Sequence, residues 1–214
     1  CAGFLSMKRL FLYLEMLLIF LGIPLFFYLY GGAVRTLSVL ILVFSVILVM
    51  LILDKNFKTK ELFMLKKAKG QLRKVFLRFI PVAAVLTIFT LIVTPETFLD
   101  FPRHNFLLWL QILLLYPIVS AYPQEVIYRA FFFHRYRKLF PKKIHMIIGS
   151  AFVFSYLHIV YDNFVAVLLT LIGGFMFSRT YSEKRSLLAA FVEHTLYGTF
   201  IFTIGLGGFF FKVV

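Results

Sequence analysis

Long apolar runs dominate this chain and exclude most of the ways in which 214 residues can fold. Hydrophobic residues make up 62% of the sequence, against the roughly 45–50% that is usual in soluble domains. Seven of the runs are long enough, or nearly so, to cross the ~30 Å apolar layer of a bilayer as helices. Lipid offers no hydrogen-bond partner to a free backbone group, so the pattern predicts an all-α polytopic membrane helical bundle with about seven transmembrane helices.

The predicted spans, in chain order, are 10–30, 33–53, 79–94, 105–133, 144–158, 164–178 and 186–204. The fourth contains Pro117 and Pro123, which predict a kink or break just ahead of Gln124. The basic segment 54–78 is predicted to form an additional amphipathic helix on the cytoplasmic surface of the membrane, the alternative being a solvated loop.

Charge is concentrated in short segments between the apolar runs, and the net charge is +14. All but four of the 23 Lys and Arg residues fall on one side of the membrane if the spans alternate in direction. This pattern predicts an integral membrane protein with a cytoplasmic N-terminus, and it argues against nucleic-acid binding despite the basic composition. A single Cys excludes an intrachain disulfide and a CxxC metal site.

Three ionisable residues from three different spans fall at similar depth in the bilayer. Counted from the cytoplasmic ends of their helices at 1.5 Å per residue, Glu125 lies about 15 Å deep, His158 about 21 Å and His194 about 12 Å. Buried polar groups need partners in lipid, so these residues are predicted to meet in a polar pocket. Arg129 follows Glu125 by four residues and shares its helix face.

A purely structural interpretation is open for each of these groups. The ion pair of Glu125 can serve to stabilise its own helix and nothing more. The two histidines also have acidic neighbours that can hold them, Asp162 for His158 and Glu193 for His194.

A buried carboxylate with two imidazoles is suited to activating water. The carboxylate can take a proton from water, one histidine can relay it, and the other can donate to the oxyanion of a tetrahedral intermediate. Glu125, His158 and His194 are also a conceivable ligand set for Zn²⁺ with an open position. Neither an H-x-x-x-H nor an H-E-x-x-H pair is present, and metal-activated and metal-free hydrolysis both stay open.

Three motifs on successive spans resemble the CPBP family of intramembrane proteases, also called the CAAX-protease and bacteriocin-processing family. The family pattern is Glu-Glu-x-x-x-Arg, then Phe-x-x-x-His, then His-x-x-x-Asn or Asp. The corresponding segments here are Gln124-Glu125-Val-Ile-Tyr-Arg129, Phe154-Ser-Tyr-Leu-His158 and His194-Thr-Leu-Tyr-Gly198. The resemblance covers roughly 105–204, so the prediction is one transmembrane domain, 1–214, with its catalytic core there and with 10–53 and 54–78 peripheral.

The resemblance implies a glutamic-type protease that cuts peptide bonds within or beside the membrane. Glu125 would be the water-activating base together with His158, Arg129 would hold the motif helix, and His194 would serve the oxyanion. Phe154 would support the site.

Two positions depart from the family pattern. Gln124 stands where the family has its first Glu, which is often assigned as the base, and Gly198 removes a second oxyanion donor that Gln124 could replace. Three explanations compete for Gln124: a branch that works with one Glu, an engineered inactivating change, and a non-catalytic relative. The sequences Pro-Gln-Glu and His-x-Leu-Tyr-Gly resemble a bacterial branch, which favours the first.

The leading functional hypothesis is an endopeptidase of a bacterial inner membrane that acts on a membrane-associated protein or peptide. The alternative is a non-catalytic relative that serves as a membrane scaffold or immunity protein. A proton or solute transporter is a third class, and the absence of an evident inverted repeat argues against it.

Overall fold

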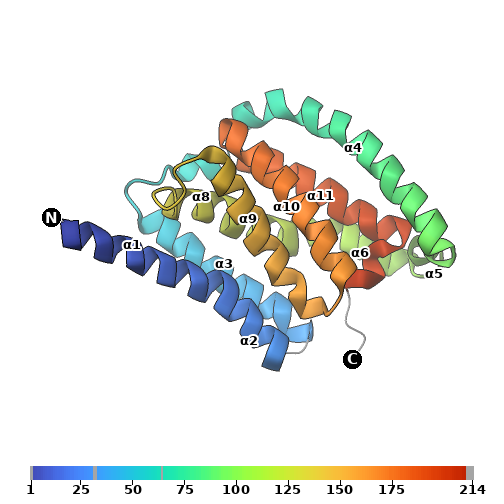
Figure 1. Ribbon diagram of the computed structural model, residues 1–214. Coiled ribbons are helices and arrows are strands. Elements are labelled where there is room, and N and C mark those ends of the chain that lie inside the picture. The colour runs from blue at the N-terminus through green and yellow to red at the C-terminus, as the bar shows by residue number, and fades with distance from the viewer. Residues whose placement is uncertain (1, 31–32, 64, 211–214) are drawn as a thin grey trace.

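Helices account for all the regular structure in the part of the chain that the computed structural model describes, residues 2–30, 33–63 and 65–210 (Figure 1). Side chains are described for 7–30, 37–63, 65 and 68–210. Six helical segments in these ranges are long and apolar enough to cross a membrane: Met7–Tyr30, Ala68–Val93, Phe106–Arg135, Lys143–Tyr161, Phe164–Lys184 and Leu187–Ile204. The predicted all-α polytopic membrane bundle is confirmed. Cys1 lies outside the described residues.

The N-terminal helices form one side of the bundle. The segment α1 (Ala2–Leu17), η1 (Leu18–Gly22) and α2 (Ile23–Tyr30) is a single rod with a π-helical turn, and α3 (Ala33–Leu53) lies beside it (Figure 1). Within α3, residues 37–53 form a shorter apolar helix, which corresponds to the second predicted span. Figure 1 places α4 on the opposite side of the bundle.

The basic segment 54–78 does not form a helix of its own, contrary to the prediction. After a turn and the short η2 (Thr59–Leu62), α4 (Leu65–Val93) continues without interruption from the basic residues into the span. Its basic half is rich in Leu, Lys, Gln and Arg, which all favour helix, so no signal stops the helix at 78. Arg78 pairs with Glu193 at 3.2 Å, and Gln71 donates to the carbonyl of Thr180 at 2.8 Å. These contacts hold the basic half of α4 against the helices that follow.

The predicted irregularity ahead of Gln124 takes the form of widened turns, not of a break. After η3 (Pro95–Thr97) and α5 (Asp100–His104), one long helix runs as α6 (Phe106–Tyr116), the π-turn η4 (Pro117–Ala121), α7 (Tyr122–Glu125), the π-turn η5 (Val126–Phe131) and α8 (Phe132–Arg135). Pro117 has no N–H to donate, which loosens the helix where η4 begins. In η5 the carbonyl of Tyr128 accepts a hydrogen bond of 2.6 Å from Ser150 of the next span.

The last three spans are bounded by local turn chemistry. They are α9 (Lys143–Leu157) with η6 (His158–Tyr161), α10 (Phe164–Lys184), and α11 (Leu187–Ile204) followed by η7 (Leu206–Phe210). Asn163 caps α10 by accepting from the backbone N–H groups of Val165 and Ala166, and Ser186 caps α11 in the same way. Gly205, with φ of +101°, ends α11 in the left-handed region.

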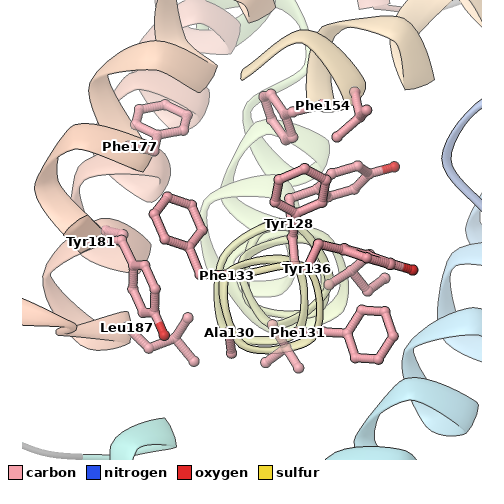
Figure 2. Close-up of a cluster of buried hydrophobic side chains, with 14 of the residues drawn as sticks. Tyr128, Ala130, Phe131, Phe133, Tyr136, Phe154, Phe177, Tyr181 and Leu187 are labelled. Atoms are coloured by element: carbon pink, nitrogen blue, oxygen red, sulfur yellow. The ribbon is translucent and has the colours of Figure 1, made fainter. Parts of the chain in front are cut away.

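An aromatic core surrounds the long helix that carries Gln124 and Glu125. Figure 2 shows this helix nearly end-on, with Tyr128, Phe131 and Phe133 radiating from it and with Phe177 and Tyr181 facing it from α10. Most rings in the cluster meet edge to face, as Phe133 and Tyr181 do with centroids 5.0 Å apart. Large aromatic side chains on every side prevent the helix from rotating about its axis, which holds its few polar groups in one orientation.

The helices α9 and α10 approach closely at Gly174. A Cβ placed there would lie 3.0 Å from Phe154 Cδ1 and 3.2 Å from the Cα and carbonyl oxygen of Ala151. Of the adjacent pair Gly173-Gly174, Gly174 is the residue that faces the neighbouring helix, and its lack of a side chain permits the close approach.

Gly174→Leu is expected to lower the melting temperature of the detergent-solubilised protein clearly. Overpacking a filled interior typically costs about 1–3 kcal/mol, more than leucine gains over glycine in helix propensity. The matched control is Gly208→Leu, because a Cβ at Gly208 meets nothing within 4 Å. Equal melting temperatures for the two variants would contradict the close approach.

Candidate active site

Glu125 is fully buried and joins two spans. Its Oε1 lies 2.9 Å from Nδ1 of His194, and its Oε2 lies 3.3 Å from Nε of Arg129. A carboxylate only accepts hydrogen bonds, so Nδ1 of His194 donates and the imidazole is held in one tautomer and one orientation. The predicted pairing of Glu125 with Arg129 on one helix face is present.

Arg129 is likewise fully buried, and it is held on several sides. Its Nη2 donates to the carbonyl of Gly174 at 3.4 Å, and its guanidinium carbon lies 4.5 Å from the ring centroid of Phe154 and 5.5 Å from that of Phe177. Two aromatic faces and a carboxylate therefore compensate the buried charge. Phe154, the first residue of the second motif, supports the site through this contact.

His194 has a second polar neighbour, which the sequence did not indicate. Its Nε2 lies 2.9 Å from the hydroxyl of Tyr116, at the end of α6. The imidazole ring stacks on Phe177 with centroids 4.8 Å apart, and the edge-to-face contact with Phe154 is 5.4 Å. Glu193, the alternative partner for His194, instead pairs with Arg78.

His158 is held by the backbone of its own helix. Its Nδ1 lies 2.9 Å from the carbonyl oxygen of Phe154, which can only accept. Nδ1 therefore carries the hydrogen, and in the neutral ring Nε2 is left as the acceptor and base. Asp162, the alternative partner considered for His158, accepts a hydrogen bond from Tyr28 at 3.2 Å.

Two apolar cavities meet at the polar groups. The larger, about 720 Å³, lies among α4, α6, α10 and α11, and the smaller, about 180 Å³, lies against η1, α2 and α3. Six residues line both cavities: Leu37, Ser120, Gln124, His158, Tyr161 and Phe210. Tyr116, His194 and Gly198 line the larger cavity only. At least one residue from each of the three motifs, namely Gln124, His158 and His194, therefore borders the larger cavity.

Gln124 presents an unused acceptor at the junction of the two cavities. Its amide nitrogen donates to the hydroxyl of Ser120 at 2.8 Å, while its Oε1 has no hydrogen-bond partner among the described residues. A buried amide oxygen without a partner is costly, so this atom is available to a water molecule or a substrate N–H.

Glu125 and His158, which the sequence predicted to act together on water, are each bonded elsewhere. Glu125 lines neither cavity, and its two oxygens are turned towards His194 and Arg129. Among the described residues no three His, Cys, Asp or Glu side chains gather as a metal site. Glu125, His158 and His194 are therefore not arranged as the Zn²⁺ ligand set that their residue types would allow.

Charged contacts at the C-terminal end of the long helix 106–135 position it against the N-terminal helices. Arg135 binds Glu15 of α1 at 2.6 Å, and Nε2 of His134 lies 2.8 Å from Oδ2 of Asp54. The hydrogen bond to His134 lowers the pKa of Asp54 to about 2, so this carboxylate stays charged in all but strong acid.

Comparison with known proteins bears on the same part of the chain. Residues 105–200 match the family model described as type II CAAX prenyl endopeptidase Rce1-like. No curated protein and no solved structure matches the chain significantly. The matched segment contains Gln124-Glu125, Phe154, His158, His194 and Gly198, all of which border or support the cavity. Residues 105–200 of this integral membrane protein, which carry the three motif segments with departures at Gln124 and Gly198, are therefore similar to the Rce1-like, or CPBP, family of CAAX-type proteases.

Proposed function

We propose that this protein is an intramembrane endopeptidase that hydrolyses a peptide bond of a membrane-associated protein or peptide where the two cavities meet. The observation that carries the proposal is that Gln124, His158 and His194, from three separate spans, line one largely apolar cavity. A base, an acceptor for water and a donor for an oxyanion are the groups that acyl transfer to water needs.

The proposed reaction begins with a water molecule between His158 and Gln124. Nε2 of His158 takes one proton while Oε1 of Gln124 accepts the other O–H, and the water oxygen attacks the carbonyl carbon of the peptide bond. The resulting oxyanion lies on the side of His194. His158 then gives its proton to the leaving nitrogen as the C–N bond breaks, which yields a carboxylic acid and an amine.

Glu125 is proposed to act through His194 and not directly on water. Its carboxylate fixes Nδ1 of His194, so that Nε2 is directed towards the hydroxyl of Tyr116, which also lines the larger cavity. This differs from the role that the family resemblance implied, because Glu125 is buried behind the histidine. Gln124 then serves as an acceptor, a task that needs no ionised carboxylate. Of the three explanations for Gln124, this arrangement favours a branch that works with one glutamate.

The substrate is proposed to be a membrane-embedded peptide. The larger cavity is lined mostly by apolar side chains of four helices, which suits an aliphatic segment or a lipid-bearing residue. The family description names prenylated CAAX substrates, and both kinds of peptide belong in the assay. We also propose that the protein lies in a bacterial inner membrane with its N-terminus in the cytoplasm.

Glu125→Gln is expected to reduce cleavage about 100-fold or more, because an amide neither fixes nor charge-balances His194 as a carboxylate does. The purified protein is reconstituted with two probes, a farnesylated CAAX peptide and a set of unmodified single-span peptides, and new termini are identified by mass spectrometry. The matched control is Glu193→Gln, which removes a buried carboxylate from the next position on α11 and is expected to retain activity.

A parallel measurement with Gln124→Glu separates the explanations for Gln124. Wild-type activity that is lost in Glu125→Gln supports a single-glutamate protease. Activity found only in Gln124→Glu would show that this chain is a disabled form of the enzyme. Wild-type cleavage equal to that of Glu125→Gln on every probe would favour the non-catalytic scaffold.

A further inference from the structure

Gly198 is the position at which the third motif lacks the polar side chain of the family pattern, and a tyrosine from another span fills that space. A Cβ built on Gly198 would overlap the hydroxyl of Tyr116 and lie 2.5 Å from its Cε1 and Cζ atoms. Real Cβ atoms do not approach a ring so closely. A side chain at 198 and the tyrosine at 116 therefore exclude each other in this arrangement.

We propose that Tyr116 is a catalytic residue whose hydroxyl donates to the oxyanion in place of a side chain at position 198. The inference rests on the proposed endopeptidase function and adds a group to that site. Tyr116 lines the larger cavity, as do Gln124, His158 and His194, so its hydroxyl lies on the border of the space that the substrate would occupy.

The hydroxyl belongs to a continuous chain of hydrogen bonds. Oε1 of Glu125 lies 2.9 Å from Nδ1 of His194, and Nε2 of His194 lies 2.9 Å from the hydroxyl of Tyr116. Because Nδ1 donates to the carboxylate, Nε2 of a neutral ring accepts the tyrosine O–H. We take His194 to enter the reaction as an imidazolium, with its second proton taken up from solvent before water attacks and balanced by the Glu125 carboxylate. Nε2 then donates to the phenol oxygen, and the tyrosine O–H is free to point at the oxyanion. His194 keeps this proton throughout, while His158 alone carries the proton from water to the leaving amine.

The π-turn between Tyr116 and Gln124 explains why both residues reach one cavity. Residues eight apart on a regular α-helix differ in direction by about 80°. The wider turn of η4, Pro117–Ala121, takes up part of that difference, because π-helical bonds span one more residue. Pro117 thus has a role in aligning the proposed oxyanion donor with the proposed acceptor for water.

Tyr116→Phe is expected to lower kcat for the cleaved probe about 100-fold and to leave KM within about twofold, because the bond to the oxyanion forms only in the transition state. The matched control is Tyr122→Phe on the same helix. The hydroxyl of Tyr122 is buried without a hydrogen-bond partner among the described residues, and Tyr122 lines neither cavity. A kcat within threefold of wild type in Tyr116→Phe would overturn the inference.

Variants that exchange the side chains at positions 116 and 198 test, independently of the hydroxyl, whether Tyr116 takes the place of a side chain at 198. Gly198→Asn alone is expected to lower the melting temperature, because the new side chain meets Tyr116. In a Tyr116→Ala background the same change is expected to cause no further decrease and to restore part of the lost kcat. If Gly198→Asn lowers the melting temperature equally in both backgrounds, the two residues do not share the space and the inference fails.

The two proposals fail in distinguishable ways. If wild type cleaves no probe faster than Glu125→Gln does, the endopeptidase function falls and the role of Tyr116 falls with it. If wild type is active, Glu125→Gln is inactive and Tyr116→Phe matches wild type in kcat, only the role of Tyr116 is overturned. A Tyr116→Phe variant that loses kcat and melting temperature together, with KM raised, would show a packing role in place of a catalytic one.

Discussion

Replacing His158 with alanine is expected to reduce peptide cleavage about 10³-fold, the largest effect on activity among these predictions. In the proposed reaction His158 accepts the proton of water and returns it to the leaving amine, and a general base of this kind contributes about 10² to 10⁴ in rate. Its Nδ1 is held by the Phe154 carbonyl, so the side chain is already oriented before substrate binds. The measurement is kcat/KM on the cleaved probe in proteoliposomes.

The matched control for this substitution is His145→Ala, on the same helix α9. His145 is exposed and lines neither cavity, so its removal is expected to leave kcat/KM unchanged. The melting temperature of His158→Ala is expected to fall moderately while the protein stays folded, because one hydrogen bond to a backbone carbonyl and the ring contacts with Phe154, Tyr161 and Phe210 are given up. Cleavage by His158→Ala at more than a tenth of the wild-type rate would remove His158 from the proposed mechanism.

Replacing Arg129 with alanine is expected to destabilise the protein by about 3–5 kcal/mol, the largest effect on stability. The ion pair with Glu125 has no exposed surface on either side chain, so the substitution leaves an unpaired buried carboxylate. It also removes the guanidinium that packs between Phe154 and Phe177. The measurement is reversible unfolding in detergent, or the melting temperature where unfolding is irreversible.

Two further variants show how much of the lost stability comes from the unpaired buried charge of Glu125. Lys74→Ala breaks an exposed ion pair with Glu183, with Lys74 65% exposed, and such pairs typically contribute about 0–1 kcal/mol. Adding Glu125→Gln to the Arg129→Ala variant is expected to restore part of the stability, because it removes the unpaired charge. If the double variant is as unstable as Arg129→Ala, the loss comes from packing and not from charge.

Much of the architecture follows from hydropathy. In lipid every backbone group must be bonded within its own segment, so each apolar run has to become a helix wherever the bundle places it. Hydropathy also predicted that Glu125, His158 and His194 meet in a polar pocket, because a charge in the apolar layer needs a partner and the three lie at similar depth. The structure places all three within one connected region around Phe154.

The sequence did not determine which side chains the buried polar groups bind. Helical spacing put Glu125 beside Arg129, but it gave no way to decide whether the carboxylate faces His158 or His194. Two π-turns rotate the motif helix by amounts that no residue pattern states, and the aromatic core then holds it in that orientation. Tyr116 was missed for the same reason, since it lies in a Leu-rich run 78 residues from His194.

The sequence by itself therefore determined that the chain forms an all-α membrane bundle and where most of its apolar helices lie, because lipid imposes those outcomes on any chain of this composition. It did not determine where α4 begins. The tertiary structure alone decided that Glu125 supports His194, that His158 and Gln124 share the junction of two cavities, and that Tyr116 occupies the space beside Gly198. These outcomes depend on the rotation of helices about their axes, which the packing of large aromatic side chains sets and which hydropathy does not encode.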